Sequence, residues 1–87
     1  MISKKVTIRK EILNPEFVVA TARLCSSFNS SIIMYAKEQT VNLKSIVNFF
    51  GTRLSRDEEV ELVFTGNDEE DASKAILELF EQTVLEN

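Results

Sequence analysis

The stretch TVNLKSIVNFFG, residues 40–51, combines a strand pattern and a helix pattern within a few residues. Polar and apolar side chains alternate over residues 40–44, which predicts a strand with one buried face. Ser45 then stands where its hydroxyl can cap the first turn of a helix. Four apolar residues follow, and Gly51 can help to end the helix. The stretch therefore predicts a strand that leads at once into a short helix.

Outside this stretch, three more segments are predicted to be strands, and the first of them alternates polar and apolar residues as a half-buried strand does. They are residues 4–10, 31–37 and 58–65. Val60, Leu62 and Phe64 are the inward-facing residues of the last segment. Only Glu38 and Gln39 lie clearly between the second segment and the strand of the opening stretch. We therefore expect a hairpin there, although its turn lacks the usual Asn-Gly or Asp-Gly.

Two longer segments repeat apolar residues at helical spacing. Asn14 can cap the first helix, Pro15 suits its first position, and Glu16 favours the positive end of the helix dipole. Val18, Ala22 and Cys25 form its predicted inner face, and Phe17, Thr21, Leu24 and Phe28 lie beside that face. The second helix follows Asn67 and Glu70, which resemble a capping box. Its predicted apolar stripe comprises Ala72, Ala75, Ile76, Leu79, Phe80 and Val84.

The element order is βαββαβα, and 87 residues are enough for one domain over residues 1–87. This order predicts an α+β fold in which a four-stranded sheet has one face covered by helices and the other facing water.

Composition excludes several classes of function. The net charge of −4 disfavours nucleic-acid binding, which needs a basic face. The small cluster of Lys4, Lys5, Arg9 and Lys10 is interpreted as a solvated strand edge. No apolar run is long enough to cross a membrane, and no signal peptide is visible, so we expect a cytoplasmic protein.

Residues that commonly carry catalysis or bind metals are scarce. The chain has no histidine, which removes the commonest general base and metal ligand. Cys25 is the single cysteine, so no intrachain disulfide can form, and we interpret it as a small buried hydrophobe. The acidic run 68–71 lacks the alternating ligands and glycine of a calcium loop. We expect neither a metal nor a cofactor.

Two motifs resemble the HPr family, the histidine-containing phosphocarriers of the bacterial phosphotransferase system. TVNLKSIVNFFG is similar to the family's third strand and regulatory-serine helix, often TVNLKSIMGVMS. FTGNDEEDASKAILEL, residues 64–79, resembles the family's last helix. An ungapped alignment from these motifs covers essentially the whole chain. The resemblance implies an open-faced β-sandwich with three helices on one face of the sheet.

The same alignment places residues 12–18 on the family's active-site motif, Gly-(Leu/Ile)-His-Ala-Arg-Pro-Ala. Asn14 stands at the phosphorylated histidine, Glu16 at the arginine that supports the phosphate, and Phe17 at the proline. An amide nitrogen is not a nucleophile at neutral pH, and a carboxylate repels phosphate. The resemblance therefore implies a degenerate site without phosphotransfer. In lacking the histidine, the chain resembles the family member Crh, although Crh keeps the arginine and the proline.

Ser45 aligns with the serine that HPr kinase/phosphorylase modifies in the family. A phosphate at a helix N-terminus is compatible with the fold, so the resemblance implies a regulatory phosphorylation site. A serine in this position is equally well explained as an ordinary N-cap. Glu16 counts against the switch, because the corresponding arginine of the family helps a partner to read the phosphate.

The family also implies a docking surface next to Ser45. The aligned residues are Phe17, Ile46, Val47 and Phe50, and we expect Phe17, Val47 and Phe50 to be partly exposed. Phe49 is assigned to the core. Asn48 replaces the usual glycine, which predicts a different partner specificity.

These residues leave three alternative functions. The favoured one is a non-enzymatic regulatory module that binds proteins, with an HPr kinase/phosphorylase or a transcriptional regulator as possible partners. The second is a pure protein-binding domain without phosphorylation. The third is a carrier. Histidine phosphotransfer conflicts with the residues of the degenerate site. An acyl carrier needs Asp-Ser-Leu on an all-helical fold, whereas Ser45 lies in Lys-Ser-Ile after a strand.

Overall fold

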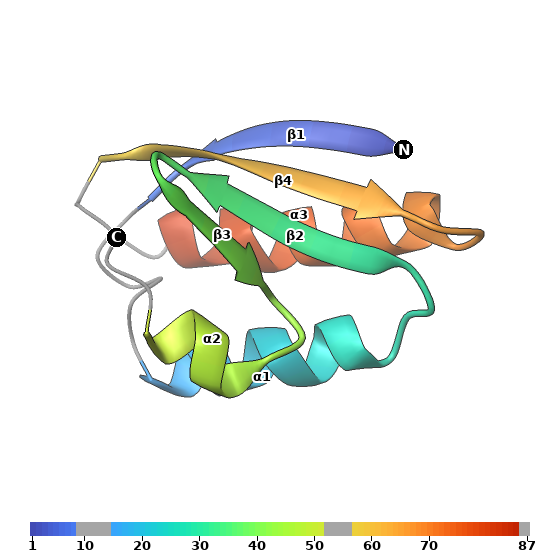
Figure 1. The fold of residues 1–87 in the computed structure, drawn as a ribbon, viewed down its shortest axis with the longest axis horizontal. Coiled ribbons are helices and arrows are strands. Elements are labelled where there is room, and N and C mark those ends of the chain that lie inside the picture. Colours follow the sequence, from blue (N-terminus) through green and yellow to red (C-terminus); the bar gives the residue numbers. More distant parts are fainter. Residues whose placement is uncertain (9–14, 52–56, 86–87) are drawn as a thin grey trace.

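The computed structural model describes residues 1–8, 15–51 and 57–85 of the chain. Its elements follow the predicted order (Figure 1): β1 (Ile2–Thr7), α1 (Pro15–Ser26), β2 (Ser31–Ala36), β3 (Gln39–Asn42), α2 (Ile46–Phe50), β4 (Glu59–Thr65) and α3 (Glu69–Leu85). The predicted α+β class and the element order are confirmed.

The four strands form one antiparallel sheet in the order β1-β4-β2-β3. Figure 1 shows the three helices on the same side of this sheet, with α1 and α3 running along it and α2 beside α1. The other face of the sheet carries no helix of the described chain. This is the open-faced arrangement that the strand and helix patterns predict.

Alternation along the strands places the core between the sheet and the helices. The inward residues of β4 are Val60, Leu62 and Phe64, and those of β2 are Ile32, Met34 and Ala36. All six are at most 2% exposed. From the helices, the fully buried contacts include Ala72, Ile76 and Phe80 of α3. The predicted inner face of α1 is also buried or half-buried.

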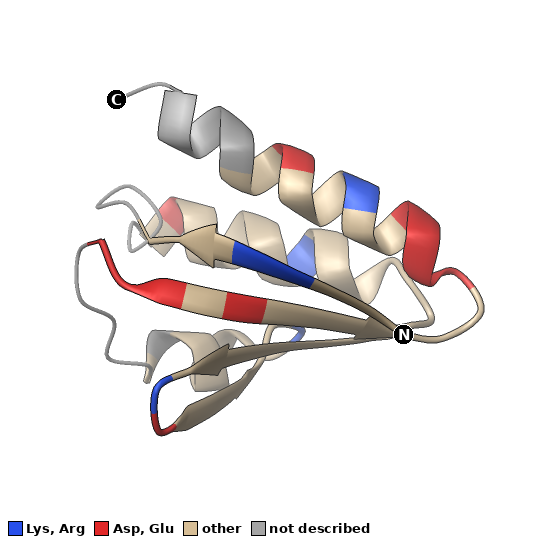
Figure 2. Ribbon diagram, turned by 90° about the horizontal axis from the view of Figure 1, so that it is seen from above, with Lys and Arg blue, Asp and Glu red and all other residues tan. Residues whose placement is uncertain are grey.

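The edge strand β1 carries exposed lysines, as its basic cluster predicts. Lys4 and Lys5 are exposed, and Lys5 lies opposite Glu61 in the pairing of β1 with β4. Figure 2 shows these basic positions beside the acidic positions of β4. Arg9 and Lys10 lie outside the described residues. The strand predicted over residues 4–10 begins at Ile2, which is earlier than expected, and its described part ends at Thr7.

The β2–β3 hairpin turns one residue earlier than the sequence indicated. Gln39 pairs with Ala36, so the turn consists of Lys37 and Glu38, and Lys37 has a positive φ of 48°. This register places Val41 opposite a buried methionine on the inner face. Because a shift of one residue would turn that valine to solvent, the core contact sets the position of the turn.

The connection from β4 to α3 is tied to the connection from α1 to β2. The Asp68 carboxylate accepts hydrogen bonds from the backbone N–H groups of Asn29 and Ser30, both at 2.8 Å. Gly66 N–H donates to Glu69 Oε1 at 3.1 Å. The expected pairing of Asn67 with Glu70 is therefore wrong. The helix begins at Glu69, and Asp68 rather than Asn67 is at its N-cap, because the Asp68 carbonyl oxygen accepts the bond from Ala72 N–H.

Candidate functional site

Ser45 caps the N-terminus of α2. Its backbone is extended, with φ −102° and ψ 112°, and its Oγ accepts a hydrogen bond from Asn48 N–H at 3.1 Å. Ser45 carbonyl oxygen accepts a bond from Phe49 N–H at 3.0 Å. Gly51 follows as the C-cap in a right-handed conformation. The predicted cap, helix and helix end are confirmed.

Two asparagines hold the backbone on either side of Ser45. Asn48 Oδ1 accepts a hydrogen bond from Asn42 N–H at 2.7 Å, and Asn42 Oδ1 accepts one from Lys44 N–H at 3.0 Å. Ser45 N–H in turn donates to Asn42 carbonyl oxygen at 3.0 Å. Sequence reasoning missed this network. Its signal is the pair of asparagines flanking a strand-to-helix turn, where short amide side chains bond nearby backbone.

The side chain of Lys44 forms a hydrogen bond with the segment that follows α1. Lys44 Nζ donates to the carbonyl oxygen of Phe28 at 2.8 Å, just beyond the end of α1. A cation suits this place because carbonyl groups at a helix C-terminus carry partial negative charge. The lysine that precedes Ser45 therefore links α2 to α1.

Cys25 lies close to this lysine and is fully buried. Burial raises the pKa of the Cys25 thiol to about 12, and the positive charge of Lys44 offsets only part of the effect. The thiolate needed for nucleophilic or redox chemistry is therefore scarce at neutral pH. The interpretation of Cys25 as a buried hydrophobe is confirmed.

Helix α2 presents an apolar surface beside Ser45. Val47 is 84% exposed and Ile46 is 38% exposed, whereas Phe49 is 3% exposed and packs in the core. The expected exposure of Val47 and the expected burial of Phe49 are confirmed. The side chain of Phe50 lies outside the described part of the chain. Throughout this article, Ile46 and Val47 are called the α2 surface.

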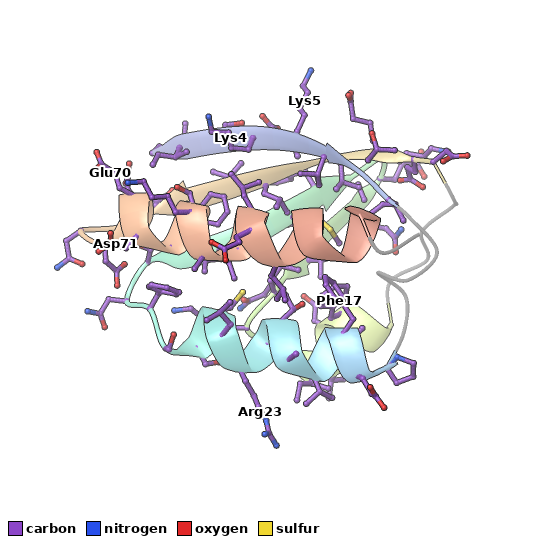
Figure 3. All side chains as sticks on the ribbon, turned by 180° about the vertical axis from the view of Figure 1, so that it is seen from behind. Lys4, Lys5, Phe17, Arg23, Glu70 and Asp71 are labelled. Atoms are coloured by element: carbon purple, nitrogen blue, oxygen red, sulfur yellow. The ribbon has the colours of Figure 1, made fainter. Side chains whose placement is uncertain are left out.

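Phe17 does not belong to this surface, and the expectation that it is partly exposed is wrong. Its exposed fraction is 9%. Its ring meets that of Phe80 edge to face, with 5.3 Å between the centroids and 74° between the planes. Figure 3 shows Phe17 pointing from α1 toward α3. Phe17 joins the core because α3 packs against α1, a tertiary contact that the local pattern of α1 does not contain.

The first turn of α1 forms the other part of the candidate site. Pro15 is the first residue of α1, as predicted, and both Pro15 and Glu16 are exposed. Asn14 lies outside the described residues, so its predicted capping role stays a prediction. Within residues 1–8, 15–51 and 57–85, no cluster of three or more His, Cys, Asp or Glu is arranged to hold a metal ion. No helix in the same ranges is both long and apolar enough to cross a membrane.

These elements define a small α+β domain in which Ser45, the α2 surface and the first turn of α1 lie side by side. A family model described as the PTS HPr component phosphorylation site matches residues 16–82. The chain belongs to this HPr family of the phosphotransferase system, whose members are phosphocarriers rather than enzymes. The match begins after Asn14 and does not test that position.

Solved structures support the same family. HPr-C-His from Thermoanaerobacter tengcongensis is 28% identical, with 95% of this chain and 94% of that chain covered and a TM-score of 0.86. The histidine-containing phosphocarrier of a Mycoplasma is also 28% identical, with 94% of each chain covered and a TM-score of 0.85.

Crh of Bacillus subtilis, a catabolite-repression protein described as a swapped dimer, shares the fold at 21% identity and a TM-score of 0.70. The match covers 94% of this chain and 88% of the Crh chain. A comparison with curated proteins finds no match.

Proposed function

We propose that this HPr-family chain is a protein-binding regulatory module, switched by phosphorylation of Ser45, that carries no phosphoryl group on a histidine. The observation that carries the proposal is the absence of histidine from all 87 residues. Histidine phosphotransfer needs an imidazole nitrogen that can accept a phosphoryl group and release it again. No other side chain of the chain provides that nitrogen.

The residues around the first turn of α1 support this loss. In the family resemblance, Asn14 occupies the histidine position and Glu16 occupies the arginine position. The nitrogen lone pair of a carboxamide is delocalised into its carbonyl group, so Asn14 cannot attack phosphorus. Glu16 is exposed in the first turn of α1. Its negative charge there repels the phosphate that an arginine would hold.

The surroundings of Ser45 are compatible with modification. Ser45 is a half-buried residue, and its hydroxyl oxygen accepts a hydrogen bond from one N–H group of α2. A phosphoserine oxygen can accept the same bond, so the cap can survive phosphorylation. The modification would add about −1.5 to −2 charges close to the α2 surface. A partner that docks on Ile46 and Val47 would then meet a charged site instead of a neutral one.

The proposed partners follow from these two features. An HPr kinase/phosphorylase would modify Ser45, and a regulator such as a transcription factor would bind the α2 surface. Phe50 remains a proposed member of that surface. Phe17 is removed from it, because its ring is buried against α3. The proposal is non-enzymatic and needs no cofactor.

The test is incubation of the purified protein with ATP and an HPr kinase, followed by intact-mass measurement. We expect one phosphoryl adduct on the wild type. Ser45→Ala removes both the hydroxyl and the cap, so it is paired with Ser45→Asn. Asparagine is as good an N-cap as serine but cannot be phosphorylated. An adduct that persists in Ser45→Asn would place the modification elsewhere and contradict the proposal.

The proposed loss of histidine phosphotransfer is tested by incubating the protein with enzyme I and phosphoenolpyruvate. A standard HPr serves as the positive control, and we expect no adduct on this chain. An acid-labile adduct on the wild type would refute the loss of phosphotransfer.

A second candidate function is a protein-binding domain without any phosphorylation. The observation that favours it is the hydrogen bond from Asn48 N–H to Ser45 Oγ, which explains the serine as a cap alone. In that case the kinase yields no adduct with any variant. Binding of a partner would then depend on Val47, tested by Val47→Asp, and would be unaffected by Ser45→Asn.

A further inference from the structure

The outer edge of β1 is a surface separate from the α2 surface. β1 stands at one end of the sheet order, and its neighbour among the described strands is β4. Ile8 exchanges two backbone hydrogen bonds, of 2.7 and 2.9 Å, with the segment that leads into β4. Because backbone groups alternate in direction along a strand, the N–H and C=O groups of Ser3, Lys5 and Thr7 point to the free edge. This edge can therefore accept another strand.

Two lysines on this edge are exposed, Lys4 and Lys5. Within residues 1–8, 15–51 and 57–85, neither lysine forms an ion pair or a hydrogen bond through its side chain. Glu61 lies opposite Lys5 on the paired side of β1, but its carboxylate accepts a hydrogen bond from Ser3 Oγ. Consecutive side chains of a strand point to opposite faces. The edge therefore offers one cation on the helix side of the sheet, from Lys4, and one on the open face, from Lys5.

Apolar side chains flank Lys4 on the helix side. Ile2 and Val6 are half-buried and pack against the core, as does Leu77 of α3. Figure 2 shows α3 lying past β1, beyond the last strand of the sheet. A strand added next to β1 would therefore lie over α3, and its inward side chains would extend this apolar contact.

These features define the sequence of a complementary strand. An added antiparallel strand places five successive residues opposite Val6, Lys5, Lys4, Ser3 and Ile2, in that order. Acidic residues suit the two positions opposite the lysines, because opposite charges attract across neighbouring strands. Apolar residues suit the positions opposite the valine and the isoleucine. The complementary pattern is thus an apolar residue, two acidic residues, any residue and a second apolar residue.

The start of α3 confines the acidic residues to the centre of such a segment. The Met1 ammonium group lies 2.7 Å from Glu69 Oε2, so the first turn of α3 is next to the start of β1. Glu70 in this turn is exposed, and Figure 3 shows it on the side of α3 that faces β1. A carboxylate opposite Ile2 would be repelled there, whereas an apolar side chain would not.

We propose that the free edge of β1 binds an extended acidic segment of another protein, which adds a strand to the sheet. In this mode of binding, main-chain hydrogen bonds give affinity and alternate side chains give specificity. A second copy of the chain is disfavoured, because the longest antiparallel overlaps of two β1 strands bring Lys4 or Lys5 opposite the same lysine of the other copy. The net charge of −4 repels acidic segments at long range, so binding depends on these two lysines.

The test uses a capped synthetic peptide, TVEETIT, which carries the complementary pattern, and NMR of the isotope-labelled full chain. In the free chain, we expect the amides of Ser3, Lys5 and Thr7 to exchange rapidly with solvent. The peptide should slow the exchange of these three amides by at least about tenfold, because each gains a hydrogen bond. An acidic ligand that binds only the lysine ammonium groups would leave their exchange unchanged.

Two peptide controls separate charge from backbone pairing. TVKKTIT keeps the apolar residues and should bind about tenfold more weakly, since both acidic residues are replaced. N-methylation of the first glutamate of TVEETIT removes an N–H group that faces β1 and should abolish amide protection. N-methylation of the second glutamate removes an N–H group that faces away from β1 and should leave protection intact.

A matched pair of protein variants tests the lysines. The double variant Lys4→Gln, Lys5→Gln should bind TVEETIT about tenfold more weakly. The control double variant Arg23→Gln, Lys37→Gln makes the same change in net charge at exposed positions of α1 and of the β2–β3 turn, and it should bind like the wild type. Circular dichroism checks that both variants are folded.

Four results would overturn the proposal. They are no binding of TVEETIT, binding without protection of the three edge amides, equal binding of TVKKTIT, and equal binding by the two double variants. In each case the lysines would serve only to keep the edge of the sheet unpaired. Protection that rises with protein concentration in the absence of peptide would show that a second copy occupies the edge, and it would overturn the proposal as well.

Discussion

Replacement of Phe17 by alanine tests where the core ends and the partner surface begins. The family resemblance places Phe17 next to Val47 on a docking surface, but in the structure the exposed fractions of the two side chains are 9% and 84%. The ring of Phe17 packs edge to face on Phe80 of α3. Because of this packing, we expect Phe17→Ala to destabilise the fold, and we expect Val47→Ala to act instead on the partner binding proposed for the α2 surface.

The size of the effect follows from the buried area. A buried phenylalanine removes about 150–250 Å² from water. At about 25 cal/mol per Å² this burial contributes about 4–6 kcal/mol. Alanine keeps part of that burial, so the expected cost is about 3–5 kcal/mol. For a domain of this size, that loss lowers Tm by about 12–40 °C. It is a large share of a total stability of about 5–15 kcal/mol.

Urea unfolding followed by circular dichroism measures the difference. We expect Val47→Ala to change the free energy of unfolding by no more than about 0.5 kcal/mol, as for other exposed sites. Phe17→Leu keeps most of the apolar volume and loses the ring contact, so it should cost about 1 kcal/mol. A cost below about 1 kcal/mol for Phe17→Ala would refute the core assignment and return Phe17 to the surface.

Three further predictions concern the turns and the core. Gly66→Ala should lower stability by about 2–4 kcal/mol in urea unfolding, because φ is +156° and the added Cβ would lie 2.7 Å from Ser30 Cα; an unchanged midpoint would contradict this. Thr21→Val should raise stability by about 1 kcal/mol, since the buried hydroxyl has no hydrogen-bond partner among the described residues, and a loss of stability would reveal a partner. The Ser30 hydroxyl, together with backbone N–H groups, lowers the pKa of Asp68 below its usual 3.8, so this carboxylate stabilises the fold above that pH and loses its contribution as pH falls through the lowered pKa. The Tm advantage of the wild type over Asp68→Asn should therefore shrink in acid, and a constant gap would show that ionisation is not its source.

Much of the secondary structure could be predicted because its causes are local. Alternation alone identified Val60, Leu62 and Phe64 as the inner face of a strand, and the structure buries all three. The cap at Ser45 was predictable because an N-cap bond spans only three residues. Pro15 marked the first turn of α1 for a similar reason, since its ring pre-sets a helical φ.

The candidate site was less predictable because its residues meet through tertiary contacts. The burial of Phe17 depends on Phe80, which lies at the far end of the chain. The hydrogen bond from Lys44 Nζ to the Phe28 carbonyl oxygen likewise joins the segment between β3 and α2 to the segment between α1 and β2. Neither partner is visible in a local pattern, because helical periodicity shows which side of a helix is apolar but not how wide a face its neighbours cover.

The sequence by itself determined the fold class, the element order and the absence of the imidazole on which the family's phosphotransfer depends. These features depend on residue identity and on spacings of a few residues, which a chain carries before it folds. Only the tertiary structure decided the strand order β1-β4-β2-β3, the turn at Lys37 and Glu38, and which aromatic rings reach solvent. Burial is a property of pairs of surfaces, so Phe17 belongs to the core because α3 packs over α1 and places Phe80 against its ring.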